Sequence, residues 1–147
     1  MTVSFTVPGI PAPGGSKTPY RNKHTGKVVL VDAGKNNAGW KHRVTVFAQQ
    51  AMAGRDPLDG PVCLVMGFKM PRPKGHYGTG RNAAKLKPWA EHARPIGAPD
   101  VTKLVRAAED ALKGIVWHDD AQVVQQFAWK RYDDVPGVEI EVARMEG

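Results

Sequence analysis

The chain has 147 residues, which is the size of a single domain with a core of its own. It carries 21 Lys and Arg against 14 Asp and Glu, so its formal net charge is +7 with His neutral. The hydrophobic fraction of 41% excludes a disordered chain, and no apolar run reaches the ~18–20 residues that cross a bilayer. We therefore expect one globular domain over residues 1–147, with no membrane partner.

The N-terminus and the cysteine content predict a cytoplasmic protein. The first nine residues lack the basic start and the apolar stretch of a signal peptide. The one cysteine, Cys63, lies in an apolar run, where we expect a small buried side chain. A single cysteine excludes a disulfide or a Cys-based zinc site within the chain and fits a reducing compartment.

The first third of the chain predicts a strand, a loop and a hairpin. Val3, Phe5 and Val7 alternate with polar residues, as in a half-buried strand. Residues 8–19 are rich in Pro and Gly and predict a loop. Residues 27–31 predict a second strand, which would pair with residues near Tyr20 across a turn at 24–26.

The middle of the chain predicts a helix and a central strand. Apolar residues recur at three- and four-residue spacing from about 37 to 53, beginning with Trp40 and Val44, which predicts an amphipathic helix. Gly54 and Pro57 end it. Residues 61–70 are almost continuously apolar and suit a central strand.

The last third predicts a long loop, a second helix and three strands. Residues 71–98 show no periodicity and many Pro and Gly, and a loop of this length in a small domain is usually either functional or disordered. A helix follows from residue 100 or 101 to 113, and Gly114 ends it. Residues 115–117 predict a short strand, and 122–131 and 138–144 predict a final strand pair. The class is therefore α+β, with a mixed sheet and two main helices.

Positive charge is concentrated in two of these segments. Residues 10–27 and 71–98 together contain ten Lys or Arg and one acid, so the rest of the chain is nearly neutral. Two basic loops on a neutral body fit contacts with a phosphate backbone, although solvated loop charge is the alternative. The residues that we expect to contact nucleic acid are Lys17, Arg21, Lys23, Arg72, Lys74, Arg81, Lys85, Lys87 and Trp89.

Carboxylates gather next to these basic loops. Asp100 follows Pro99 at the predicted helix start, where its simplest role is an N-cap. Asp119 and Asp120 follow the short predicted strand, where adjacent acids also suit a turn. Magnesium prefers hard oxygen ligands and keeps several waters, so one or two carboxylates and a substrate phosphate suffice to bind it. Cations on the helix, at Lys103 or Arg106, would stabilise the charge of a phosphoryl transition state.

The same stretch resembles a known family. Pro99-Asp100, Leu104, Arg106, Asp110-Ala111-Leu112, Gly114, Trp117, Asp119-Asp120 and Gln122 together resemble the RusA-type Holliday junction resolvases, in their phage-borne branch. The resemblance implies a homodimeric endonuclease that uses Mg²⁺, with Mn²⁺ as a substitute, to nick four-way DNA junctions in recombination, repair or phage DNA processing. It also implies a location at the nucleoid of a bacterial or phage-infected cell.

The family pattern assigns roles to residues of this chain. It makes Asp100 and Asp120 catalytic metal ligands, with Asp119 a helper, and it places Arg106 where the family has a catalytic lysine. Lys103 would assist Arg106. The family has another acid two residues after the first, and here that position is Thr102. Asp119, Asp110 or a substrate phosphate would then supply the missing oxygen.

Two other functions remain open at this stage. The loss of an acid at Thr102 fits a catalytically weakened or inactive protein that binds branched DNA. The basic loops alone also fit an RNA-binding module, which would bind structured RNA more tightly than junction DNA at equal salt.

Overall fold

Four strands form one mixed sheet in the order β1-β6-β4-β5. The computed structural model describes the backbone outside residues 15–16, 22–27 and 33–36, and side chains outside 15–36. β4 pairs antiparallel with β6 and parallel with β5, and β1 pairs antiparallel with β6. The strands of this sheet are β1 (Thr2–Pro8), β4 (Val62–Met70), β5 (Val123–Tyr132) and β6 (Gly137–Arg144).

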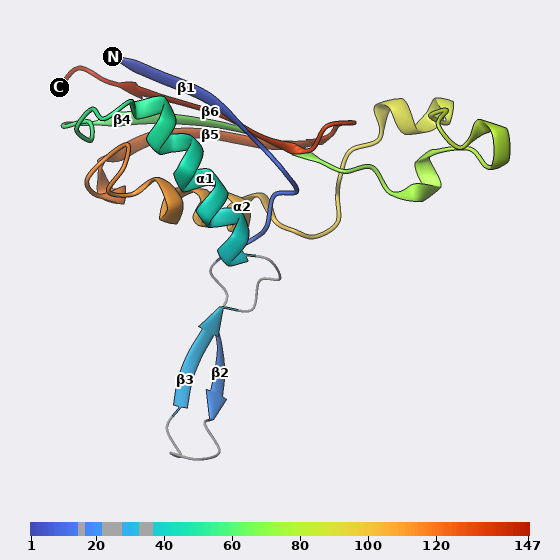
Figure 1. Ribbon diagram of the computed structural model, residues 1–147, viewed down its shortest axis with the longest axis horizontal. Helices are drawn as coiled ribbons and strands as arrows, with labels where there is room; N and C mark the ends of the chain where they lie inside the picture. Colours follow the sequence, from blue (N-terminus) through green and yellow to red (C-terminus); the bar gives the residue numbers. More distant parts are fainter. Residues whose placement is uncertain (15–16, 22–27, 33–36) are drawn as a thin grey trace.

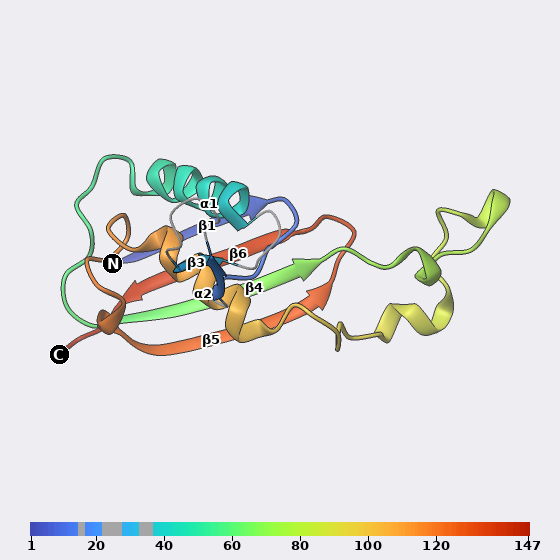
Figure 2. The same cartoon turned by 90° about the horizontal axis from the view of Figure 1, so that it is seen from below.

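Both main helices lie on one face of this sheet (Figures 1 and 2). Helix α1 (Asn37–Met52) packs on β1, and α2 (Val101–Leu112) packs on α1 and β5. Apolar residues of α2 recur every three or four positions, so one side of the helix is buried in the core. The core is made of this side of α2, the inward residues of α1 and the helix-facing side chains of the sheet, among them Val44, Leu64, Phe68, Leu104 and Val142.

The predicted α+β class, the mixed sheet and the two helices are confirmed. Both helices begin and end within one residue of their predicted bounds. Gly114 follows the end of α2 with φ +80°, a left-handed conformation that glycine adopts without steric cost. No helix among the described residues is both long enough and apolar enough to span a bilayer.

The predicted pairing of the last two strands is wrong. β5 and β6 follow each other in sequence, but β4 lies between them in the sheet. β4 is the most apolar of the strands, and a central position lets it pair on both edges and bury its side chains. The alternation of polar and apolar residues shows that a segment is a strand, but it does not show which strands are neighbours.

Three smaller predictions also differ from the structure. Residues 115–117 form no strand. The Ile115 and Val116 N–H groups both bond to the Leu112 carbonyl, which turns the chain after α2, and Trp117 makes isolated bridges to Lys113 and Leu58. The loop predicted over 8–19 ends early, because β2 (Lys17–Arg21) begins inside it. As expected, β2 pairs with β3 (Val28–Asp32), and Tyr20 lies opposite Val29. The predicted turn at 24–26 lies outside the described residues. Cys63 is half-buried, because its strand points it toward the helix-free face.

The long segment 71–98 leaves the sheet after β4 and returns to the start of α2 as an extended arm (Figure 1). It contains three short 3-10 helices: η1 (Lys74–His76), η2 (Gly80–Asn82) and η3 (Pro88–His92). The buried His76 ring meets the rings of Trp89 and Tyr132 edge-on, at centroid distances of 5.1 and 4.8 Å. These ring contacts tie the base of the arm to the end of β5.

Candidate active site

A groove of about 510 Å³ runs along the exposed side of α2, between this helix and β5. Thr102, Arg106 and Glu109 line it from successive turns of the helix, because residues three or four apart share a helix face. Asp120 faces them from the segment before β5. The remaining lining residues are Val101, Val105, Asp110, Gln126 and Ala128.

Asp120 is held in the groove from the core. It begins the short helix η4 (Asp120–Gln122), which leads directly into β5. The indole N–H of Trp117, which is 0% exposed, donates a 2.8 Å hydrogen bond to Oδ1 of Asp120. A carboxylate fixed in this way by a buried donor loses little further conformational freedom when it binds a ligand.

Asp119, by contrast, caps η4. Its side chain accepts a hydrogen bond from the Ala121 N–H at 2.9 Å, and the Asp119 N–H in turn donates to Oε1 of Gln122 at 2.9 Å. Gln122 also donates to the Leu58 and Gly60 carbonyls, which anchors this cap to the loop before β4. The two adjacent acids therefore differ: only Asp120 lines the groove.

Glu109 is the groove carboxylate that the sequence analysis did not identify. Partial burial raises the pKa of Glu109, the nearby charges of Asp120 and Asp110 raise it further, and Arg106 opposes them. Glu109 lies two helical turns beyond Thr102 on the same face. Thr102, Arg106 and Glu109 form a polar stripe that the sequence already contains, but a polar stripe on a helix is usually a solvated face.

Asp100 stands at the N-cap position of α2, as predicted, but its side chain makes no capping hydrogen bond. Its Oδ2 lies 3.9 Å from Nζ of Lys103, which is one turn further along the helix. Asp100 is exposed and directly precedes the lining residues Val101 and Thr102 in the chain. Of the two predicted ligands, Asp120 therefore lines the groove with Arg106, whereas Asp100 is not among its lining residues.

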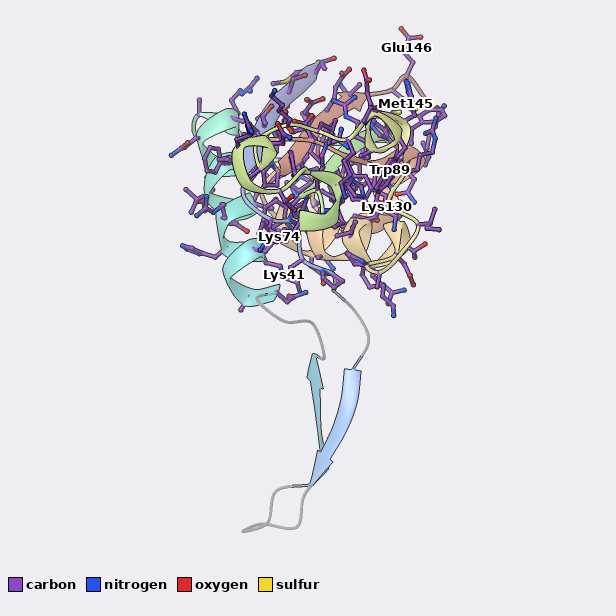
Figure 3. The ribbon with its side chains drawn as sticks, turned by 90° about the vertical axis from the view of Figure 1, so that its right-hand side faces the viewer. Lys41, Lys74, Trp89, Lys130, Met145 and Glu146 are labelled. Atoms are coloured by element: carbon purple, nitrogen blue, oxygen red, sulfur yellow. The ribbon has the colours of Figure 1, made fainter. Side chains whose placement is uncertain are left out.

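Lys130 of β5 holds the segment that leads into α2. Its ammonium group donates to the carbonyls of Gly97 at 2.6 Å and Pro99 at 2.9 Å. The labelled side chain is seen in Figure 3, below Trp89. Because Pro99 directly precedes Asp100, these two bonds set where Asp100 and the helix start lie relative to β5.

Two other acids have partners outside the groove. Asp110, a candidate for the missing oxygen, forms an ion pair of 3.1 Å with Lys41 of α1. Asp59 lies 3.1 Å from Nε2 of His118, which directs this imidazole toward the loop before β4.

The residues of the groove fit a magnesium ion in their chemistry. Asp120 and Glu109 offer carboxylate oxygens, and Thr102 offers a hydroxyl, which are the hard ligands that magnesium prefers. Asp100, at the start of the same helix, would add another carboxylate. Among the described residues, no three His, Cys, Asp or Glu side chains are already gathered as a ready-made metal cluster. An ion here would therefore take several of its ligands from water and from a bound phosphate.

The predicted nucleic-acid residues fall into two groups. Lys74, Arg81, Lys85 and Trp89 are exposed on the arm, and Trp89 is 60% exposed. Figure 3 views the molecule from the side of the arm, with Lys74 and Trp89 labelled on it. Lys87 of the same segment is half-buried. In the N-terminal basic segment, the backbone places Lys17 and Arg21 at the two ends of β2, whereas Lys23 lies outside the described residues.

Arg72 has a structural position instead. Its guanidinium donates to the Ala90 carbonyl at 2.8 Å and lies 5.8 Å from the centre of the Tyr132 ring. It also lies 3.8 Å from Asp134, and only 11% of its side chain is exposed. These contacts brace the arm against the end of the sheet, so we do not assign Arg72 to DNA contact.

Two comparisons relate the chain to known proteins. The family model described as "Endodeoxyribonuclease RusA" matches residues 10–143, which include both helices, the arm and every groove residue. The chain is also similar to the protein described as "Uncharacterized protein YqaN" of Bacillus subtilis (strain 168). The two are 32% identical over 142 residues, which cover 95% of this chain and 94% of the relative.

Proposed function

The chain belongs to the RusA endodeoxyribonuclease family, and from this premise we propose that it is a magnesium-dependent endonuclease that nicks four-way DNA junctions. The observation that carries the proposal is the groove itself, which is lined by Asp120, Glu109 and Arg106, on the helix that Asp100 begins. Carboxylates opposite a cation are the groups that phosphodiester hydrolysis needs, and the basic arm adjoins them. We expect it to act on DNA in the cytoplasm, as a homodimer, because a junction has two strands to cut.

In this proposal, Asp100 and Asp120 hold the metal, and Glu109 takes the place of the acid that Thr102 replaces. Bound there, magnesium would polarise the scissile phosphate and lower the pKa of a water ligand. Asp120 keeps its orientation through Trp117, so it presents its carboxylate without rearrangement. The Arg106 guanidinium lies where it can offset the negative charge that develops on the phosphate oxygens, with Lys103 one turn away.

The exposed residues of the arm would hold the DNA. Lys74, Arg81 and Lys85 offer charges for phosphates, and the exposed Trp89 ring offers a surface on which an unpaired base near the crossover can stack. The arm joins the helix that carries the groove, so DNA bound along it would pass by Asp100.

The decisive experiment measures nicking of a synthetic four-way junction in magnesium. We expect Asp120→Asn to lower the rate at least about 100-fold, since it removes a metal-binding charge and leaves the shape intact. Asp119→Asn is the matched control, because asparagine also caps helices and the side chain lies outside the groove. Equal activity of wild type and Asp120→Asn would refute the assignment of the site.

One observation favours a second function. Thr102 puts a neutral hydroxyl in the groove where the family has an acid, which fits a protein that binds branched DNA without cutting it. If wild type binds the junction but is inert, and Thr102→Asp restores cleavage, this second function is correct. Strong cleavage by the wild type would exclude it.

A further inference from the structure

A second hollow, of about 530 Å³, lies at the base of the arm and shares no lining residue with the groove. Segments that are distant in sequence build it: the loop after β1, the end of β4 with the start of the arm, the end of the arm, and the end of β5. Six prolines line it, together with apolar side chains such as Ile10 and Met70 and the ring of Tyr132. The function proposed above makes no use of this hollow.

The wall formed by residues 10–13 is fixed at both of its ends. The Gly9 N–H donates to the Pro136 carbonyl at 3.1 Å, and the Gly14 N–H donates to the Lys103 carbonyl of α2 at 2.9 Å. A Cβ on Gly14 would come within 3.0 Å of the backbone of α2, so the loop packs closely against this helix. The prolines restrict the backbone further. The hollow is therefore largely preformed, and a ligand would enter it at little cost in conformational entropy.

The walls of the hollow fit a neutral, flat ring. Among the described residues that line it, Lys130 carries the one formal charge, and its ammonium group is bonded to the carbonyls of Gly97 and Pro99. The other walls are mainly proline rings, alkyl groups and the Tyr132 ring, which are surfaces on which a planar heterocycle can stack. The volume lies within the range of about 300–1,000 Å³ that is typical of ligand pockets.

Exposed basic side chains flank this apolar lining in the chain. Lys74 directly follows the lining residue Pro73, and Arg94 directly precedes the lining residue Pro95. Both bases are exposed. A ligand that joins an apolar ring to phosphates would match the lining and its flanks together. A nucleotide of DNA has this chemistry, whereas an apolar peptide segment lacks the phosphates.

The hollow adjoins the groove along β5. Ala128 lines the groove, and Lys130, the next residue on the same face of the strand, lines the hollow. Two such residues are about 6–7 Å apart. The segment that leads into α2 has the same order, since Pro99 lines the hollow and Val101 lines the groove. A DNA strand with a phosphate in the groove would therefore have a neighbouring base within reach of the hollow.

We propose that the hollow binds one unpaired base of the DNA, from a nucleotide next to the scissile phosphate. The inference deepens the proposed function and rests on it for the substrate, which is branched DNA. The cost of unpairing a base is lowest where the duplex is already disturbed, as at a branch point. Trp89 does not line the hollow, so this site is separate from the stacking surface on the arm.

The test compares two synthetic four-way junctions that lack the same base pair at the branch point. In the first junction the base is kept and its partner is replaced by an abasic site, and in the second the base itself is replaced. Because both have lost the same pair, the ratio of their dissociation constants measures the contacts of the base. Each position that flanks the branch point is scanned in turn. The titrations are made in EDTA, so that cleavage does not interfere.

At one of these positions, we expect the wild type to bind the first junction at least about 5-fold more tightly than the second. Ile10→Asp should bring this ratio close to one, because it places a charge in the wall of the hollow. Ile10 is 64% exposed, so the change does not disturb the core. Ile96→Asp is the matched control: Ile96 is 97% exposed, next to Pro95 in the chain, and does not line the hollow. It should keep the ratio of the wild type.

A second variant guards against an indirect effect of the new charge. Ala98→Trp fills the hollow from an exposed lining position without changing the charge, and it should also bring the ratio close to one. Thermal melts check that all three variants are folded.

Two results would overturn the inference and leave the proposed function standing. One is a wild-type ratio close to one at every scanned position, which would show that the hollow takes no base. The other is an unchanged ratio in both Ile10→Asp and Ala98→Trp. A protein that binds neither junction would overturn the inference and the proposed function together.

Discussion

The buried indole N–H of Trp117 holds the carboxylate of Asp120 at 2.8 Å, which links the core of the domain to its candidate active site. We predict that Trp117→Phe lowers both activity and stability, since it removes the donor but keeps most of the apolar volume. Loss of a hydrogen bond to a charged group costs about 1.5–3 kcal/mol. Junction cleavage and urea unfolding check the two effects.

Trp40→Phe provides the matched control for this change. Trp40 is also buried, but its Nε1 has no hydrogen-bond partner among the described residues. Phenylalanine there removes a donor that has no acceptor in the described part of the chain, and Trp40 does not line the groove, so cleavage should be unchanged. If both variants lose activity equally, packing rather than the Trp117 hydrogen bond orients the site.

Glu109→Gln should stabilise the protein at neutral pH while it weakens metal binding. The pKa of Glu109 is raised in the fold, mainly by partial burial and then by Asp120 and Asp110, so its ionised form is disfavoured there. Its contribution to stability is present below the unfolded-state pKa and is lost as pH rises through the raised value. Glutamine does not ionise, so the variant does not lose stability as pH rises in this way. Because Glu109 is half-exposed, the resulting gain in Tm should stay within about 3 °C.

The measurement is a thermal melt at pH 4 and pH 7, with and without magnesium. We expect the difference between Glu109→Gln and wild type to be small at pH 4 and larger at pH 7. Added magnesium should raise the Tm of the wild type more than that of the variant, because the bound ion would stabilise the ionised carboxylate of Glu109. An equal rise in both proteins would remove Glu109 from the metal site.

Lys130→Met should slow cleavage by loosening the start of α2. The ammonium group holds the Gly97 and Pro99 carbonyls, and methionine keeps the apolar stem but loses both donors. Because Asp100 follows Pro99, we expect a fall in kcat of about 10- to 100-fold from its displacement, with KM little changed. Lys130→Arg should recover part of the rate. A change confined to KM would instead indicate that Lys130 contacts DNA.

The arm should supply salt-sensitive DNA affinity. Arg81→Ala with Lys85→Ala removes two exposed charges, so the slope of log affinity against log salt should fall by up to about 1.8. Lys113→Ala, an exposed base at the opposite end of α2, is the control and should leave the slope unchanged. Titration of labelled junction DNA at several salt concentrations measures both. An unchanged slope in the double variant would show that Arg81 and Lys85 do not contact the DNA backbone.

The sequence by itself determined the main helices and strands of this protein and the residue types of its candidate site. Apolar spacing located both helices and the central strand, because a buried stripe must repeat with the period of its element. The acids near Asp100 and Asp120, with Arg106 between them in the chain, identified the stretch that lines the groove. Periodicity and residue type are local properties, and they can be read without a structure.

Only the tertiary structure decided how these parts meet. It placed β4 between β5 and β6, assigned Asp119 to a cap and Asp120 to the groove, and brought Glu109 to face Asp120. It also left Phe127 and Trp129 on an open face. Each of these results depends on contacts between residues distant in sequence or on the direction of one side chain, which no local pattern records.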